Sequence, residues 1–198
     1  MYPGSIRNLI ECLKDLPGIG EKSAERLAYA IVGFSKEKLE NFANSLISIK
    51  DNIKRCPICN CITDMDKCYI CNDVNRVSDK IFVVEKSKDI ILFEKMGTYN
   101  GKYHVLDGLI SPMDGINPDD INLNSLVKRV QEDNVSEVIV VLKPSIEGET
   151  TMQYIKKILS KYNVKVSKIP IGIPMGTDIE YIDTMTLEMA FEDRKDVA

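Results

Sequence analysis

Cys56-Pro-Ile-Cys59 and Cys68-Tyr-Ile-Cys71 are two Cys-x2-Cys pairs separated by eight residues. A Cys-x2-Cys turn places two sulfurs on one metal ion, and two such turns complete a closed tetrahedral site. Because a closed site leaves no open coordination position, the pattern predicts one structural Zn²⁺ per chain, held by Cys56, Cys59, Cys68 and Cys71. The alternative is an incidental group of reduced thiols, which the paired spacing disfavours.

The chain has six cysteines, and five of them lie within sixteen residues. Scattered core thiols are not distributed in this way, and such a cluster in a cytosolic chain favours a metal site over disulfides. Cys61 is the fifth thiol of the cluster, and Cys56-x4-Cys61 is an alternative first pair. The two-residue spacing makes the better knuckle, so Cys61 is predicted not to be a ligand. The single histidine, His104, excludes a site built on several histidines.

The composition is that of a globular protein: 198 residues, 44% apolar and 28% charged. It excludes a collagen-like, disulfide-stapled or wholly disordered chain. Apolar runs stay far below the roughly 20 residues of a membrane span. The N-terminus lacks an apolar signal region, so we expect a cytoplasmic protein without membrane contact. The net charge is −4, yet residues 1–55 carry nine Lys or Arg against seven Asp or Glu. This local excess is compatible with a phosphate-binding face.

Leu16-Pro-Gly-Ile-Gly20 separates two segments with helical spacing of apolar residues, 5–15 and 21–32. Gly18 and Gly20 let the backbone turn tightly and approach another surface closely. Amides at the start of the second helix would then face a phosphate, and Lys22 and Arg26, four residues apart, would project beside them. The pattern predicts a helix-hairpin-helix that binds DNA backbone without sequence preference. The alternative is a corner that uses the Pro-Gly only to turn.

A further amphipathic helix is predicted over residues 35–53. After the cysteines, the pattern of apolar residues changes to alternating strands and helices. Predicted strands at 81–84, 103–106, 138–142 and 164–169 alternate with predicted helices at 86–96, 122–133 and 150–162. This alternation predicts a parallel sheet covered by helices. The Gly- and Pro-containing stretch 171–176 precedes a last helix from about Asp183. The fold class is therefore α+β with several modules.

Four modules are expected along the chain. They are a helix-hairpin-helix region (1–55), a four-cysteine zinc finger (56–76), an α/β domain with a parallel sheet (79–171) and a C-terminal helical segment (172–198).

Acidic residues follow two of the predicted strands. Glu85 comes directly after the strand at 81–84, and Glu147 and Glu149 follow the strand at 138–142. The carboxyl ends of parallel strands are where α/β folds place their sites. These three glutamates are therefore candidates for a binding surface, with solvated loop carboxylates as the alternative.

Four stretches in this order resemble the bacterial RecR family of recombination mediators, and the resemblance covers nearly the whole chain. The stretches are Leu-Pro-Gly-Ile-Gly-Glu-Lys-Ser-Ala-Glu-Arg-Leu-Ala (16–28), Tyr-His-Val-Leu-Asp-Gly-Leu-Ile-Ser-Pro-Met-Asp-Gly-Ile (103–116), Glu-Gly-Glu-Thr (147–150) and Gly-Ile-Pro-Met-Gly-Thr-Asp-Ile-Glu-Tyr-Ile-Asp (172–183). The family's α/β domain is a Toprim domain, the fold shared with topoisomerases and primases. The resemblance thus implies a Toprim domain here.

The catalytic Toprim pattern has a Glu after the first strand and Asp-x-Asp after a later one. Glu85 matches the first position, whereas Lys143 and Ser145 stand at the two Asp positions. Family members also carry non-acidic residues there, commonly Asn and Thr, so Lys143 is a further departure, as is Asp107 where the family usually has Gly. Magnesium-assisted phosphoryl transfer needs clustered oxygen anions, and a lysine repels the cation. No catalytic residue is therefore expected.

The resemblance implies a non-enzymatic mediator that binds single- and double-stranded DNA. It would act with RecO and RecF to load RecA onto single strands covered by single-strand-binding protein. Lys22 and Arg26 would contact phosphates, and Glu85, Glu147 and Glu149 would meet partners. The family also implies a homo-oligomer, a dimer or a ring-shaped tetramer. Two rival functions are a Toprim nuclease or primase-like enzyme, and a zinc-stabilised protein-protein adaptor that binds no DNA.

Overall fold

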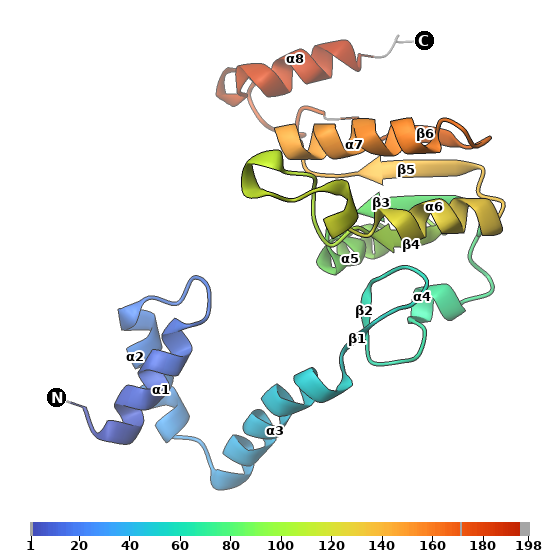
Figure 1. Cartoon of the computed structure of the whole chain (residues 1–198). Coiled ribbons are helices and arrows are strands. Elements are labelled where there is room, and N and C mark those ends of the chain that lie inside the picture. The colour runs from blue at the N-terminus through green and yellow to red at the C-terminus, as the bar shows by residue number, and fades with distance from the viewer. Residues whose placement is uncertain (1, 171, 195–198) are drawn as a thin grey trace. The chain divides into compact units, whose positions relative to one another are not determined.

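The computed structural model describes residues 2–170 and 172–194, and the chain divides into two compact units between Ile53 and Lys54 (Figure 1). The two units are described separately. In the part of the chain that the structure describes, no helix has the length and apolar character needed to cross a membrane.

The first unit consists of helices α1 (Gly4–Lys14), α2 (Glu21–Val32) and α3 (Lys36–Asn52). Helices α1 and α2 pack around Ile10, Ala24 and Ala28, which are buried, and the two alanines lie one turn apart on α2 so that the helices approach closely. Pro3 stands at the N-cap of α1. In α3, all of whose residues are described, none is buried.

The second unit begins with the cysteine segment. Strands β1 (Lys54–Arg55) and β2 (Ile62–Thr63) pair antiparallel and carry the first Cys-x2-Cys turn between them, and the short helix α4 (Tyr69–Asn72) carries the last cysteine. These elements escaped prediction from the sequence because each is only two to four residues long, too short to show a hydrophobic period.

A four-stranded parallel sheet follows, in the order β4-β3-β5-β6, as the alternating pattern predicted. The strands are β3 (Lys80–Val84), β4 (Lys102–Val105), β5 (Glu137–Val141) and β6 (Lys165–Lys168). They are joined by α5 (Ser87–Met96), α6 (Leu123–Glu132) and α7 (Ile146–Leu159), with the 3-10 turns η1 (Pro112–Asp114) and η2 (Pro118–Asp120) before α6. The turn η3 (Ile179–Tyr181) and α8 (Thr184–Glu192) complete the described chain.

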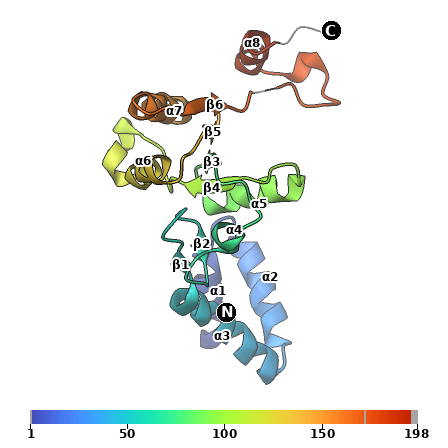
Figure 2. The ribbon, with the colours of Figure 1, turned by 90° about the vertical axis from the view of Figure 1, so that its right-hand side faces the viewer.

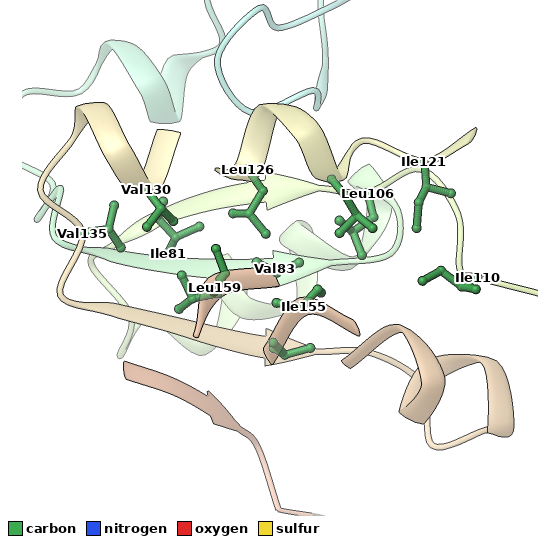
Figure 3. Close-up of a cluster of buried hydrophobic side chains, with 13 residues drawn as sticks. Ile81, Val83, Leu106, Ile110, Ile121, Leu126, Val130, Val135, Ile155 and Leu159 are labelled. Atoms are coloured by element: carbon green, nitrogen blue, oxygen red, sulfur yellow. The ribbon is translucent and has the colours of Figure 1, made fainter. Parts of the chain in front are cut away.

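Side-chain alternation along β3 supplies the cores on both faces of the sheet. Ile81 and Val83 face α6 and α7 and belong to a cluster that includes Leu126 and Ile155 (Figure 3). The intervening Phe82 and Val84 belong to a second cluster on the other face, which includes α5 and four of the cysteines. Figure 2 shows the sheet edge-on, with α5 on one side and α6 and α7 on the other.

Helix α7 begins at Ile146, four residues before the helix predicted from the sequence. Ser145 is its N-cap and accepts a hydrogen bond from the backbone N–H of Gly148 at 3.2 Å. Gly148 is required there, because an added Cβ would lie 2.1 Å from the backbone oxygen of Lys143. Glu147 and Glu149 therefore belong to the first turn of a helix and not to a loop.

Candidate functional site

The structure brings the four predicted metal ligands together. The sulfurs of Cys56, Cys59, Cys68 and Cys71 all lie within 4.8 Å of one another, and the Cys59 and Cys68 sulfurs are 3.5 Å apart. Four sulfurs bound to Zn²⁺ at about 2.3 Å in a tetrahedron would be separated by about 3.8 Å. Three of the four residues are buried. The donor set and its geometry thus fit a closed Zn²⁺ site.

Each pair is held by backbone hydrogen bonds typical of a metal knuckle. In the first, Cys56 N donates to Cys61 O at 2.8 Å and Asn60 N donates to Cys56 O at 2.9 Å. Asn60 adopts a left-handed conformation with φ 61°, which asparagine tolerates better than most residues. In the second, Cys68 is the N-cap of α4, and its sulfur accepts from Cys71 N at 3.4 Å.

Four ionised thiolates need a cation at this separation. Hydrogen bonding to the Cys59 sulfur raises the pKa of Cys71 above its ordinary value and lowers that of Cys68. Zn²⁺ would displace the thiol protons and so link metal binding to pH.

Cys61 lies against this cluster without belonging to it. Its side chain is buried, and its sulfur donates to Ile62 O at 3.6 Å. Hydrogen bonding to the Cys59 sulfur raises its pKa. Cys61 is not one of the four cysteines whose sulfurs lie within 4.8 Å of one another, and its exclusion from the ligand set stays a prediction.

The cysteine segment packs onto the sheet and covers its β4 edge. Val105 N donates to Cys59 O at 2.8 Å, and the side-chain amide of Asn60 donates to Val105 O at 3.1 Å. All four residues of β4 are buried although β4 is an edge strand. The cysteine segment is too short to bury a hydrophobic core alone. Its buried cysteines instead belong to the same hydrophobic cluster as residues of the sheet.

The predicted hairpin joins α1 to α2 with a tight turn. Gly18 has φ +83°, a conformation that favours glycine, and Ile19 N donates to Leu16 O at 3.1 Å. Gly20 is the N-cap of α2 and offers no side chain to its first amides, which are thus left for another acceptor. This is the local geometry that a phosphate oxygen requires.

The two predicted phosphate-binding cations, Lys22 and Arg26, are exposed on α2. Among the residues that the structure describes, neither side chain forms an ion pair. By contrast, Lys14 at the end of α1 is held by Glu21 at 2.7 Å and by Glu11 at 3.2 Å. Lys22 and Arg26 therefore keep their charges available to an incoming anion.

The three predicted partner-binding glutamates lie at the carboxyl ends of β3 and β5. Glu85 is half-buried and its carboxylate lies 3.5 Å from the ammonium of Lys86. A hydrogen bond from the Ser145 side chain lowers the pKa of Glu147, which therefore stays ionised. Glu149 is exposed and accepts from Gln153 at 2.8 Å.

These glutamates do not converge on a metal site. Within residues 2–170 and 172–194, the four cysteines are the only group of three or more His, Cys, Asp or Glu side chains close enough to share an ion. Lys143 is exposed, and Ser145 uses its hydroxyl as the N-cap of α7. The arrangement supplies no cluster of oxygen anions of the kind that magnesium-assisted phosphoryl transfer needs.

Asp107 follows β4 at a position where the backbone is left-handed, with φ 64°. This conformation explains why glycine suits the position. In this chain the carboxylate forms an ion pair with Arg55 of β1, and the Asp107 N–H donates to Glu85 O at 2.9 Å. The departure from glycine thus creates a link between the cysteine segment and the sheet.

Three contributors to this region escaped prediction: Arg55, Lys102 and His104. His104 is buried on β4, where Asn122 O lies 2.8 Å from its Nε2, and Lys102 is buried at the start of the same strand. The sequence signal available for Lys102 and His104 was a basic or imidazole side chain in or next to the predicted strand at 103–106. It carried no information about the partner, because each contact joins segments far apart in sequence.

Comparisons with known proteins match three parts of the chain and its whole length. The family model described as RecR, helix-hairpin-helix matches residues 6–50, the Toprim domain model matches 79–170, and the model described as RecR, C-terminal matches 172–195. The chain is also 45% identical over 196 residues to "Recombination protein RecR" of Natranaerobius thermophilus, covering 99% of this chain and 98% of that protein.

Proposed function

The chain belongs to the RecR family of recombination proteins, and on this premise we propose that it is a non-enzymatic mediator of DNA recombination and repair that binds DNA. The observation that carries the proposal is the hairpin. Gly18 is left-handed there, the start of α2 has no side-chain cap, and Lys22 and Arg26 form no ion pair with any residue that the structure describes. Amides and cations of this kind bind phosphates of single- and double-stranded DNA without reading bases.

The metal in the proposed mediator is one structural Zn²⁺ per chain, held by the four paired cysteines. The ion would have a structural role: by binding cysteines from both turns, it would hold β1, β2 and α4 together as one rigid element. The support is the donor set itself, four sulfurs within 4.8 Å of one another, most of them buried.

RecO and RecF are the proposed partners, and the proposed outcome is the loading of RecA onto single strands. This part of the proposal follows from the family. Glu147 and Glu149 support it, since they add negative charge at one turn of α7 and would steer a basic partner. Glu85 would contribute at the neighbouring strand end.

A closed homo-oligomer is also proposed, with one self-contact at each end of the chain. Two observations support it. Helix α3 exposes Phe42, Leu46 and Ile49, and the C-terminal segment exposes Met185 and Phe191. Closed symmetric assemblies are the usual way to cover such faces. Mass measurement in solution over a concentration series tests it, and a strictly monomeric protein at high concentration contradicts it.

The second candidate function is a Toprim nuclease or primase-like enzyme, favoured only by the fold and by Glu85. It is opposed by Lys143 and Ser145 at the two Asp positions. A zinc-stabilised adaptor without DNA binding is the third, and it is opposed by the free cations of the hairpin.

The test of the proposed function is RecA loading in a purified system. RecA ATPase activity on single strands covered by single-strand-binding protein is measured with RecO, with and without this protein. We expect the protein to shorten the lag before ATP hydrolysis. Glu147→Lys with Glu149→Lys should lengthen the lag while DNA binding by the hairpin stays unchanged. A lag of the same length with and without the wild-type protein contradicts the mediator role.

A further inference from the structure

Lys102 is a buried cation that lacks a carboxylate partner. It is the first residue of β4, its exposed fraction is 8%, and its ammonium donates to the backbone oxygens of Ile70 at 2.8 Å and Asp73 at 2.7 Å. Among residues 2–170 and 172–194 it forms no ion pair. A buried charge is costly unless an opposite charge compensates it.

The other two cations in this region are compensated. Arg76 forms ion pairs with Glu94 and with Asp73, the latter at 3.5 Å. Arg129, also buried, contacts the Asp133 carboxylate at 3.2 Å and donates to Tyr103 O at 2.6 Å. The contrast leaves Lys102 as the buried cation that pairs with no carboxylate of the described residues.

The two carbonyls that hold Lys102 flank the metal ligand Cys71. Ile70 precedes this cysteine directly, and Asp73 is the C-cap of the same short helix, α4. Lys102 and Cys71 also line one pocket of about 240 Å³, together with Ile58, Ser78, Arg129 and Asp133, whose carboxylate is held by Arg129 at 3.2 Å. The ammonium therefore contacts the backbone on both sides of Cys71 in the sequence and shares a pocket with that residue.

A four-cysteine Zn²⁺ centre has a net negative charge, since four thiolate charges outnumber the two positive charges of the ion. Two backbone N–H groups of the described chain donate to the ligand sulfurs, and both are neutral. Cys68 N donates to the Cys56 sulfur at 3.5 Å, and Cys71 N donates to the Cys68 sulfur at 3.4 Å. A fixed positive charge beside the centre would stabilise the thiolates, and the thiolates would compensate the buried ammonium.

We propose that Lys102 is the counter-ion of the metal centre. It couples metal binding by the cysteine segment to the Toprim sheet, because the charge sits on a sheet strand and the ligands sit on the segment. This inference rests on the proposed Zn²⁺ site and goes beyond it, since it assigns a role to a residue outside the ligand set. By reciprocity, metal binding stabilises strand β4, and a charged residue at position 102 stabilises the bound metal.

The test compares variants of the full-length protein that separate charge from hydrogen bonding. Lys102→Gln keeps a donor for the two carbonyls and removes the charge, whereas Lys102→Arg keeps both. Lys102→Met is a second neutral variant should the first fail to fold. Lys80→Met is the matched control, because Lys80 is the first residue of β3 and is exposed.

Zn²⁺ affinity is measured by competition with a chelator of known affinity. We expect the neutral variants to lose roughly 10- to 100-fold in affinity, the range found when a partner of a metal ligand is removed. Lys102→Arg and Lys80→Met should stay close to the wild type. Equal affinity in all variants overturns the inference while leaving the Zn²⁺ site intact. A wild-type protein that binds no Zn²⁺ overturns the metal site itself and this inference with it.

Co²⁺ substitution supplies a readout that a purely structural role would not move. Removing a positive charge beside the sulfurs raises the energy of their electrons, so the thiolate-to-cobalt absorption band should move to longer wavelength in the neutral variants. The band should stay in place in Lys102→Arg. Loss of affinity with an unshifted band would show that Lys102 only caps α4 and would overturn the counter-ion role.

Discussion

Arg55 of β1 forms an ion pair with Asp107, the residue that follows Val105 and Leu106 after β4, across 52 positions of sequence. The guanidinium also donates to Asn60 O at 3.1 Å, so one side chain contacts both the first cysteine turn and the sheet. Asp107 holds this position despite a left-handed backbone. The pair fastens the cysteine segment to the carboxyl end of the sheet.

Substitutions at Asp107 should separate the ion pair from the backbone strain. Asp107→Ala loses the pair and keeps the strained conformation, and it should lower the free energy of unfolding by about 1–2 kcal/mol. Asp107→Gly loses the same pair but relieves the backbone, so it should change stability by less than about 1 kcal/mol. Urea unfolding of both variants checks the order. Alanine as stable as glycine would contradict the account of the left-handed position.

Serine substitutions distinguish the metal ligands from the neighbouring thiol. Cys56→Ser and Cys71→Ser should lose Zn²⁺ and much of the solubility, because a structural metal supplies part of the folding free energy. Cys61→Ser should keep one Zn²⁺ per chain. Metal analysis of the purified variants gives the answer, and full metal in Cys71→Ser together with loss in Cys61→Ser would reverse the ligand assignment.

His104 should make the protein sensitive to mild acid. Burial lowers its pKa to about 4 from the ordinary value of 6.5, and Asn122 O lies 2.8 Å from its Nε2 while, among the described residues, its Nδ1 has no partner. Because the folded pKa lies below the unfolded one, the unfolded chain binds the proton first as pH falls. The stabilising contribution is complete above about pH 6.5 and is lost progressively down to about pH 4.

The expected loss between pH 7 and pH 5 is about 2 kcal/mol in the free energy of unfolding. His104→Gln removes the titrating group, so its stability should fall by about 2 kcal/mol less than that of the wild type over the same interval. Urea unfolding at the two pH values measures the difference. Parallel pH dependence in the two proteins would show that His104 titrates normally.

The Toprim domain should not cleave or join DNA. Lys143 adds a positive charge where the catalytic pattern has a carboxylate, and like charges repel, so the position disfavours a bound divalent cation. Incubation with supercoiled plasmid and Mg²⁺ or Mn²⁺ should leave the plasmid intact. Metal-dependent nicking that disappears in Glu85→Gln would restore the enzyme hypothesis.

Periodicity and spacing predicted the parts of the fold that depend on local sequence. The Cys-x2-Cys pairs predicted the cluster of sulfurs, and alternating helices and strands predicted the parallel sheet. The predicted start of helix α7 was four residues too late, because Glu147-Gly-Glu was interpreted as a polar loop. The presence of glycine at position 148 is explained by the close approach of its backbone to the Lys143 carbonyl, which cannot be seen in the sequence.

Contacts between distant segments could not be predicted from one sequence. Lys102 meets Ile70 across 32 positions, and nothing in the pattern Gly-Lys-Tyr-His indicates that this lysine points toward the cysteine segment. The ligands themselves are predictable since they recur at fixed spacing. The residues that compensate their charge and hold them on the sheet come from elsewhere in the chain.

DNA binding by the hairpin is the central claim, and a titration of fluorescently labelled single- and double-stranded DNA by anisotropy tests it most directly. Affinity of the wild type should fall steeply with salt, because phosphate contacts release counterions. Lys22→Glu with Arg26→Glu should abolish binding while the fold, checked by thermal unfolding, is retained. The matched control, Lys88→Glu with Lys95→Glu, makes the same charge change at exposed positions of α5 and should bind as the wild type does. Unchanged affinity in the folded hairpin variant, or equal loss in the control, would contradict the account.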